Sequence, residues 1–208
     1  MSVLDELANA LGRNDERPNV ELAERLAGKP DSRAIRELIG ALNAGTSAVQ
    51  NDAIKVLYEI GERRPELFGP SDVEAFLATL KSRNNRLVWG GMSALAALAG
   101  TQPTLIAKQL PAILEAADKG SVIAKDKAIA ILVALAQHGH ATAALPILLD
   151  RLAEAAPNQF PTYAEQIATV ADRTQKPKLV AVIEKRLPKV TGDAKVKRLR
   201  KLLATLAK

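Results

Sequence analysis

The chain has 208 residues, of which 48% are hydrophobic, 25% are charged and only 3% are aromatic. Alanine and leucine, two strong helix formers, supply nearly a third of the positions, which excludes an all-β fold and a disordered chain. The net charge is +6, and the absence of cysteine excludes disulfides and thiolate chemistry.

The N-terminal segment carries two early acids, Asp5 and Glu6, and no basic region before them, which excludes a secretory signal. Two long segments lack charge, 87–107 and 128–149, but glycines, prolines and histidines interrupt them. Neither offers the roughly 20 strongly apolar residues that a membrane-spanning helix needs. We therefore predict a cytoplasmic protein that does not enter the membrane.

In chain order, residues 1–30 predict a cap made of two short, irregular helices, over 3–11 and 20–26. Beyond the cap, an apolar stripe with the spacing of one helix face (i, i+3, i+4 and i+7 or i+8) occurs five times. The stripes recur at intervals of 34 to 38 residues, beginning at Ile35, Val73, Leu110, Leu145 and Leu179.

A second series of apolar stripes alternates with the first, beginning at Val49, Leu87, Ala124, Ile167 and Val196, with Ile167 the weakest. Gly45, Gly120 and Gly192 mark turns between the two series, and Ser71-x-x-Glu74 has the spacing of a capping box. Each repeat is therefore predicted to be a helical hairpin, and the five hairpins are 32–62, 70–100, 103–139, 141–174 and 176–208.

The third hairpin resembles the HEAT repeat. Residues 110–117 resemble its first helix, with Pro111 near the start of the apolar run, and residues 124–135 resemble its second helix. The resemblance extends over residues 32–208 and implies an all-α fold, an α-α superhelix (HEAT-like solenoid), in a single domain over 1–208. In HEAT-like solenoids the second helices line a concave face. The first turn of that helix usually carries Arg or Lys, and the corresponding positions of this chain hold Gln50, Val88, Lys125 and Tyr163.

Catalytic and metal-binding motifs are missing from the sequence. It has no Gly-x-Ser-x-Gly nucleophile elbow and no glycine-rich phosphate loop. The only two histidines, His138 and His140, flank Gly139, an arrangement typical of a helix C-terminus and insufficient for a metal site. We therefore predict a protein that is not an enzyme and has no cofactor and no bound metal.

The most unusual local sequence is Trp89-Gly90-Gly91, because each glycine inside a helix costs about 1 kcal/mol relative to alanine. Because glycine has no side chain, either a binding partner or a neighbouring helix can approach the backbone closely at these two positions. Trp89 is then either a binding hot spot or a side chain packed in a repeat junction. The predicted register places Trp89 in a row of residues on the second helices, which consists of Gln50, Trp89, Lys125 and Tyr163. This row either binds a ligand or only covers the inner surface.

Positive charge is concentrated at the C-terminal end. Residues 176–208 hold eleven Lys or Arg against two acids, a net charge of +9. On the last predicted helix an apolar face opposes a basic patch, which consists of Lys195, Lys197, Arg198, Arg200 and Lys201. The patch either keeps a terminal repeat soluble or binds an acidic protein or nucleic-acid phosphates. Attachment to a membrane surface is the weakest alternative.

These features favour a non-catalytic protein–protein interaction module, a monomeric scaffold or adaptor whose partner is another protein. The alternative is a nucleic-acid-binding protein that uses the basic patch. The resemblance to HEAT-like DNA glycosylases implies concave aromatic residues beside a catalytic aspartate, a role that the sequence assigns to neither Asp126 nor Asp172. Some HEAT-like proteins attach bilin pigments to other proteins, but nothing in this sequence is specific for that activity.

Overall fold

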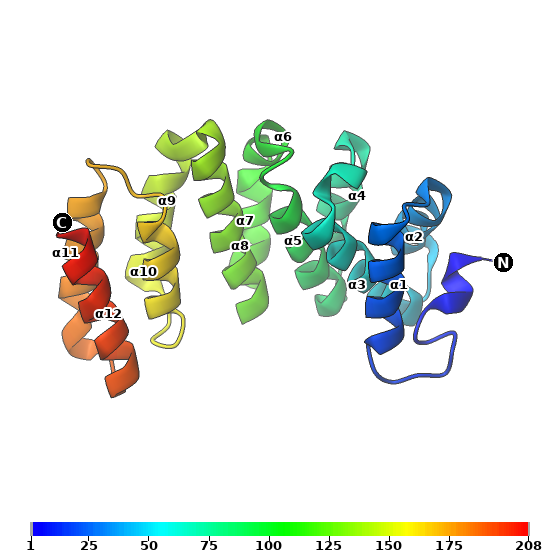
Figure 1. Cartoon of the computed structure of the whole chain (residues 1–208), viewed down its shortest axis with the longest axis horizontal. Helices are drawn as coiled ribbons and strands as arrows, with labels where there is room; N and C mark the ends of the chain where they lie inside the picture. Colours follow the sequence, from blue (N-terminus) through cyan, green and yellow to red (C-terminus); the bar gives the residue numbers. More distant parts are fainter. Residues whose placement is uncertain (1, 208) are drawn as a thin grey trace. The chain divides into compact units, whose positions relative to one another are not determined.

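Every regular element in residues 2–207, the part of the chain that the computed structural model describes, is helical (Figure 1). The chain divides into two compact units, Met1–Ala128 and Ile129–Lys208. The boundary lies within a helix, so the repeat array expected over 1–208 contains a division that the periodic sequence pattern does not show.

The first unit consists of short helices whose bounds follow the predicted hairpins. Both helices of the hairpins predicted over 32–62 and 70–100 are present, and the hairpin that starts at residue 103 has an additional six-residue helix, α6, at its start. The elements are η1 (Val3–Glu6), α1 (Arg17–Gly28), α2 (Ser32–Ala44), α3 (Ser47–Arg63), η2 (Pro65–Leu67), α4 (Pro70–Thr79), α5 (Asn85–Leu98), α6 (Pro103–Lys108), α7 (Leu110–Lys119) and the first part of α8 (Val122–Leu135).

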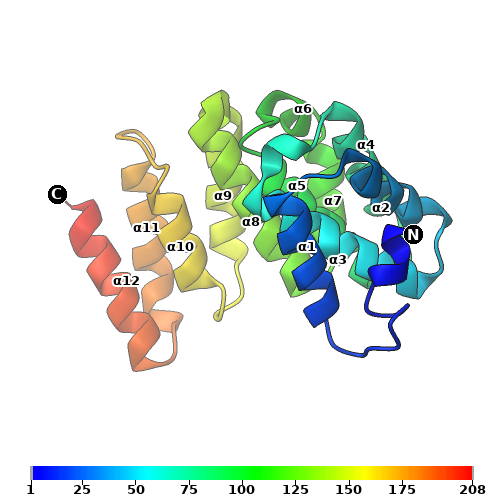
Figure 2. The ribbon, with the colours of Figure 1, turned by 45° about the vertical axis from the view of Figure 1, so that its right-hand side comes forward.

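The helices of the first unit pack in two rows. α3 packs against α1 on one side and α5 on the other, and α2 contacts α4. Hairpin partners also pack together, α2 on α3 and α4 on α5, so one row holds α1, α3 and α5 and the other holds α2 and α4 (Figure 2). The apolar stripes meet between the rows, where Leu38, Ile54, Phe76 and Leu95 are fully buried.

The N-terminal cap differs from the two predicted helices. α1 contains the second of them, but the predicted helix over 3–11 is only the four-residue 3-10 helix η1 followed by turns, so that prediction was wrong. Side chains of α1 and α3 bind the backbone N–H groups there instead. Asn19 Oδ1 accepts from Ala8 N at 2.9 Å, and Asp52 Oδ2 accepts from Asn9 N at 2.8 Å.

The predicted capping box at Ser71 is also displaced. α4 begins at Pro70, whose missing N–H has no cost in the first turn of a helix. The reciprocal hydrogen bond comes from Asp72, whose Oδ2 accepts from Gly69 N at 2.8 Å. Asp72 is only 1% exposed and pairs with Arg36 of α2, so the start of α4 is tied to the preceding hairpin.

The two adjacent glycines bring α5 close to both of its neighbours in the first unit. A Cβ atom at Gly90 would lie 2.7 Å from Ile54 Cγ1 of α3, and a Cβ atom at Gly91 would overlap Thr79 Oγ1 of α4. A larger residue at either position would force the helices apart. Of the two explanations for the glycines, the approach of neighbouring helices is the one that the structure shows.

The second unit begins within α8 and repeats the two-row packing. α9 contacts α11, α10 contacts α12, and the hairpin partners α9 and α10 as well as α11 and α12 pack together. Phe160 and Leu148 are among its fully buried side chains. The elements that follow α8 are η3 (Ala136–His140), α9 (Ala141–Glu154), α10 (Phe160–Ala168), α11 (Lys176–Arg186), η4 (Leu187–Lys189) and α12 (Asp193–Leu206).

His138 follows the C-terminal end of α8, as the sequence predicts, whereas His140 directly precedes α9 as its N-cap residue. Gly139 has a φ of 90°, which favours glycine, and His138 Nδ1 lies 2.8 Å from the carbonyl oxygen of Ala134. By length and composition alone, Val122–Glu154 is the one candidate for crossing a membrane among the described residues. The non-helical backbone at His138 and Gly139 divides it into α8 and α9, each of 14 residues and thus shorter than a span of about 20.

Candidate functional site

Three residues of the predicted row lie on second helices of the first unit, in different environments. Gln50 of α3 donates from Nε2 to Leu42 O at 2.9 Å and so closes the α2–α3 hairpin. Lys125, in the first turn of α8, is exposed. Trp89 of α5 is half-buried and lies among charged and aromatic side chains. Trp89 is therefore the member of the row whose surroundings suit a binding site.

The fourth residue of the row, Tyr163, does not lie on a surface. It belongs to α10 of the second unit and is only 6% exposed. The buried stripe of this helix begins at Phe160 and continues through Tyr163, Ala164 and Ile167, with the spacing of a core-facing helix. The predicted stripe begins too late, at Ile167, and in this register Tyr163 was expected on the surface, although it faces the core.

The indole of Trp89 is held between an aromatic ring and a cation. Its centroid lies 6.0 Å from that of Tyr58 on α3, with the rings tilted by 52°. The guanidinium carbon of Arg86 lies 5.8 Å from the Trp89 centroid, and Lys55 Nζ lies 4.8 Å from the Tyr58 centroid. Such cation–π and tilted ring contacts each stabilise by about 0.5–1 kcal/mol. They fix the orientation of Trp89 while part of its side chain stays exposed.

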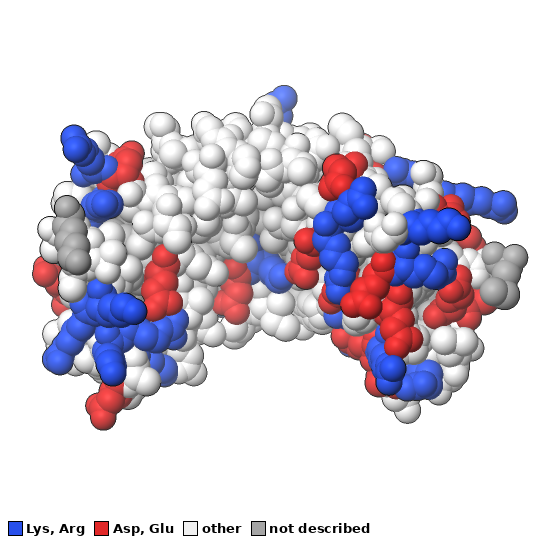
Figure 3. Space-filling view, in the orientation of Figure 1, with Lys and Arg blue, Asp and Glu red and all other residues white. Residues whose placement is uncertain are grey.

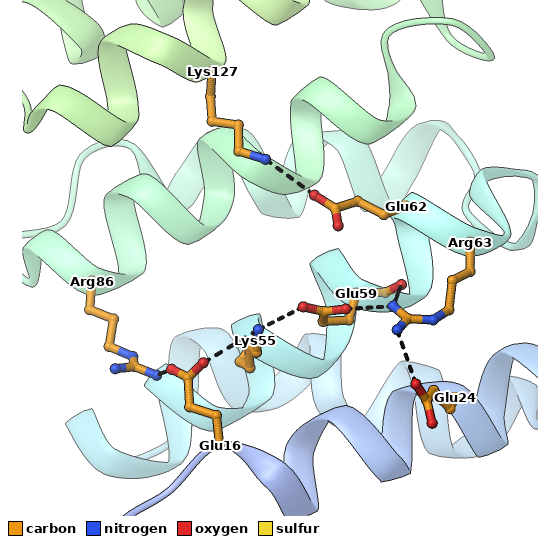
Figure 4. A network of polar contacts seen from close by, with 8 residues as sticks. All are labelled: Glu16, Glu24, Lys55, Glu59, Glu62, Arg63, Arg86 and Lys127. Carbon is orange, nitrogen blue, oxygen red and sulfur yellow. Dashed lines mark hydrogen bonds and ion pairs between the residues drawn. The ribbon is translucent and has the colours of Figure 1, made fainter. Parts of the chain in front are cut away.

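Carboxylates join the same cations into a continuous series of ion pairs, here called the charge ladder (Figure 4). Glu16, just before α1, pairs with Arg86 and lies 3.3 Å from Lys55 Nζ. On α3, Lys55 binds Glu59 at 2.6 Å and Glu59 pairs with Arg63. Arg63 also lies 3.3 Å from Glu24 of α1. In order, the ladder consists of Arg86, Glu16, Lys55, Glu59, Arg63 and Glu24.

The ion pair between Lys55 and Glu59 is the most buried pair of the charge ladder, with side chains 10% and 15% exposed. Burial alone would lower the pKa of Lys55, but hydrogen bonds with Glu59 and Tyr58 outweigh it, and this pKa lies above 10.5. Burial would raise the pKa of Glu59, but hydrogen bonds from Lys55 and Arg63 outweigh it, and this pKa lies below 4.5. Both side chains are therefore charged at neutral pH. Burial raises the pKa of the Tyr58 phenol, which stays neutral.

A separate ion pair connects α3 with α8. Lys127 Nζ lies 3.1 Å from Glu62 Oε1, and Figure 4 shows the two side chains extending toward one another from their helices. The pair joins positions 65 residues apart and so links two different hairpins of the first unit.

The arrangement suits recognition by contact. Among residues 2–207 no group of three or more His, Asp or Glu side chains is placed to hold a metal ion. The charges of the ladder are paired with one another, and two of its cations, Arg86 and Lys55, lie against the rings of Trp89 and Tyr58. Aromatic residues and arginine are enriched at the centre of protein–protein interfaces, and polar residues form the rim around them.

In the second unit, the structure separates the predicted basic patch into two groups. Arg198 pairs with Glu165 at 2.6 Å, and Lys195 Nζ donates to Asn158 Oδ1 at 2.6 Å. Lys197, Arg200 and Lys201 are exposed and line a shallow hollow of 520 Å³. Figure 3 shows basic side chains gathered over α12, whereas acidic and basic side chains alternate over α1 to α5.

The predicted apolar face of α12 is only partly covered. Leu199 is fully buried, while Val196, Leu203 and Leu206 are half-buried. The helix therefore packs on its neighbours along one line and turns its basic side outward. This geometry agrees with the polar outer face that a terminal repeat requires, and it leaves three cations of the patch accessible to an anion.

The sequence analysis missed most of the residues around Trp89. Lys55, Glu59 and Arg63 follow one another at i, i+4 spacing on one helix, a signal of helical ion pairs that is visible in the sequence. Arg86 and Trp89 are likewise three residues apart on α5. The contact of Glu16 with Arg86 joins positions 70 residues apart, which no local pattern reveals.

Comparisons with known proteins identify the fold. No family model matches the sequence, and no curated protein matches it. Among solved structures, an engineered protein is similar over 100% of this chain and 97% of its own, with 18% identity and a TM-score of 0.59. A designed armadillo repeat protein, solved in complex with the peptide (KR)4, is similar over 98% of this chain and 99% of its own, with 16% identity and a TM-score of 0.62. The predicted HEAT/armadillo-like helical repeat fold is thereby confirmed.

Proposed function

We propose that this protein is a non-catalytic binding module that holds a segment of another protein against the α3–α5 surface of its first unit. Trp89 is the anchor of the surface, and the charge ladder is its border. The observation that carries the proposal is the fixed, half-exposed indole between Tyr58 and Arg86. Aromatic residues held in this way are enriched among the few residues that dominate binding free energy.

The armadillo-like fold supports the proposal in general terms, because folds of this kind commonly bind proteins and one designed neighbour was solved with a peptide. The chemistry of the partner follows from the ladder. Its carboxylates at Glu16, Glu24 and Glu59 already have intramolecular cations. A peptide rich in Lys and Arg would have to displace those cations, so it gains little. We expect a segment of mixed charge with an apolar or aromatic side chain for Trp89.

The test uses Trp89 as its own probe, because it is the only tryptophan of the chain. A displayed library of random peptides is selected against the full chain, and the peptides obtained are titrated while Trp89 fluorescence is followed. We expect Trp89→Ala to weaken binding of these peptides by about 30-fold or more, measured by isothermal titration calorimetry.

The matched control replaces another exposed apolar side chain of the same unit. Leu11 is 55% exposed and lies in the cap, so Leu11→Ala should bind the selected peptides like the wild type. The (KR)4 peptide serves as a comparison ligand and should bind more weakly than the selected peptides. Selected peptides that bind Trp89→Ala as tightly as the wild type would overturn the proposal.

A second candidate function is binding of a nucleic acid through α12. It is supported by the exposed Lys197, Arg200 and Lys201 around one hollow and by the net charge of +9 over residues 176–208. Fluorescence anisotropy with a labelled single-stranded RNA and a labelled DNA duplex tests this candidate. The triple charge reversal of these three residues should abolish binding, and the wild-type affinity should fall steeply with salt. Binding that salt leaves unchanged contradicts this function.

A further inference from the structure

A hollow of 610 Å³ lies in the first unit between the C-terminal end of α4, the start of α5 and α7. Its apolar lining includes Leu77 and Leu80, which are half-buried, and Val88, which is 8% exposed. Ala112 and Ala116 of α7 face it with small side chains. The volume suits a few bulky side chains of a bound segment, since ligand pockets typically measure about 300–1,000 Å³.

The rim of this hollow is basic. Lys81 and Arg83, from the turn between α4 and α5, and Lys119, at the end of α7, are all exposed. The one acid in the lining, Glu115, is bound to Lys119 Nζ at 2.5 Å. Lys81 and Arg83 thus add positive charge that no carboxylate in the lining offsets. The N-terminus of the 14-residue helix α5, at Asn85, adds the positive end of its dipole.

From this combination we infer that the hollow is a docking site for an acidic segment of a partner protein that carries leucine or phenylalanine side chains. The apolar side chains occupy the space above Leu77, Leu80 and Val88, and the carboxylates meet Lys81 and Arg83. The chemistry disfavours a nucleic acid, because among the described residues no aromatic side chain lines the hollow for a base to stack on. The site is distinct from the α3–α5 surface around Trp89, so the two proposals stand independently.

The test compares two synthetic peptides of about sixteen residues and equal negative charge, one with leucines at every third or fourth position and one with those leucines replaced by serine. Binding to the full chain is measured by fluorescence anisotropy. The leucine-bearing peptide should bind about tenfold or more tightly than the serine-bearing peptide. The double variant Lys81→Glu/Arg83→Glu should weaken its binding by about tenfold or more.

Two further variants make the result specific. Lys29 and Lys108 are exposed lysines of the same unit outside the hollow, so Lys29→Glu/Lys108→Glu carries the same change of net charge and should bind normally. Ala112 is exposed, so Ala112→Gln fills the hollow without a change of charge or a buried substitution and should weaken binding. Trp89→Ala should have no effect, which separates this site from the proposed function.

Four outcomes would overturn the inference. The first is equal affinity for the two peptides, and the second is an equal loss of binding in the charge-matched control. The third is competition by a single-stranded RNA that binds the same residues more tightly than the leucine-bearing peptide. The fourth is no detectable binding of the leucine-bearing peptide at about 1 mM, when circular dichroism shows that the protein is folded.

Discussion

The two units of the molecule stabilise their helices with different charge chemistry. Residues 1–128 hold sixteen Lys or Arg and seventeen Asp or Glu, whereas residues 129–208 hold thirteen and six. In the first unit the cations link helices through carboxylates, as in the charge ladder. In the second unit Arg186 instead donates to the carbonyl oxygens of Leu152, Ala153 and Ala155, at 2.8, 3.1 and 2.6 Å. At Arg186 neutral oxygens thus take the place of carboxylates, and the thirteen basic and six acidic residues leave the second unit with a net charge of +7.

The ion pairs between helices of the first unit require the helices to pack closely. The largest effect is therefore expected from a substitution that disrupts this packing. Gly91→Ala should lower the free energy of unfolding by about 3 kcal/mol, because its Cβ would overlap Thr79 Oγ1 and lie 3.1 Å from Phe76 O. Urea unfolding followed by circular dichroism measures the change. The control is Gly40→Ala in α2, where nothing lies within 4 Å, and which should stabilise by up to about 1 kcal/mol. Equal effects of the two variants would refute the packing argument.

The next largest effect is expected in the second unit, where Arg186 binds three backbone carbonyl oxygens. Arg186→Met should destabilise by about 2 kcal/mol, because three carbonyls lose a charged donor and the contact with Phe160, whose ring centroid lies 4.3 Å from the guanidinium carbon, is lost. Thermal and urea unfolding measure the loss. Lys185→Met, at the exposed neighbouring position, should change stability by less than about 0.5 kcal/mol. A similar loss in both variants would show that helix propensity, not carbonyl binding, explains the effect.

The buried ion pair of the charge ladder should make the stability of the first unit depend on pH. Glu59→Gln should destabilise by about 1.5 kcal/mol at neutral pH, because Lys55 and Arg63 lose their shared carboxylate. The pKa of Glu59 is lowered in the folded state, so its contribution is present above the ordinary value of 4.5 and is lost as the pH falls through the folded pKa. The difference between wild type and variant should therefore shrink as the pH is lowered below 4.5 and through the folded pKa of Glu59. A difference that is constant with pH contradicts this assignment.

The smallest effect is expected from the exposed ion pair of the second unit. Arg198 and Glu165 are 45% and 39% exposed, so Glu165→Gln should cost less than about 0.5 kcal/mol. Solvent screening should remove the difference at about 1 M salt. Unfolding at low and high salt measures it, with Glu184→Gln on the exposed side of α11 as the comparison. A loss as large as that of Glu59→Gln would show that ion pairs contribute equally to the stability of the two units.

The hairpins could be predicted from sequence because their signal is local. An apolar stripe such as the one that begins at Ile35 needs only seven or eight consecutive residues to define a helix face. The cap and the division between units could not be predicted in the same way. The turn after η1 is held by Asp52, which lies 43 residues from its partner Asn9, and such a contact leaves no periodic trace.

The candidate site was predicted in part. Trp89 stood out because two glycines follow it, and glycines within a helix need a reason. The register error at Tyr163 arose because α10 has only nine residues, too few for its stripe to recur and settle the phase. Tyr58 and Lys55 lie on a different helix from Trp89, so only the packing of α3 against α5 reveals that they belong to the same surface.

The close approach of neighbouring helices at Gly90 and Gly91 also limits which substitutions this sequence can accept during evolution. Gly90 faces Ile54 and Gly91 faces Thr79, and neither contact leaves room for an added methyl group. An alanine at 90 therefore becomes acceptable only after residue 54 has become smaller, and an alanine at 91 only after residue 79 has done so. In each pair, the substitution at residue 54 or 79 should therefore occur before the substitution of the glycine that it faces. In any set of homologous sequences, 54 with 90 and 79 with 91 should be covarying pairs.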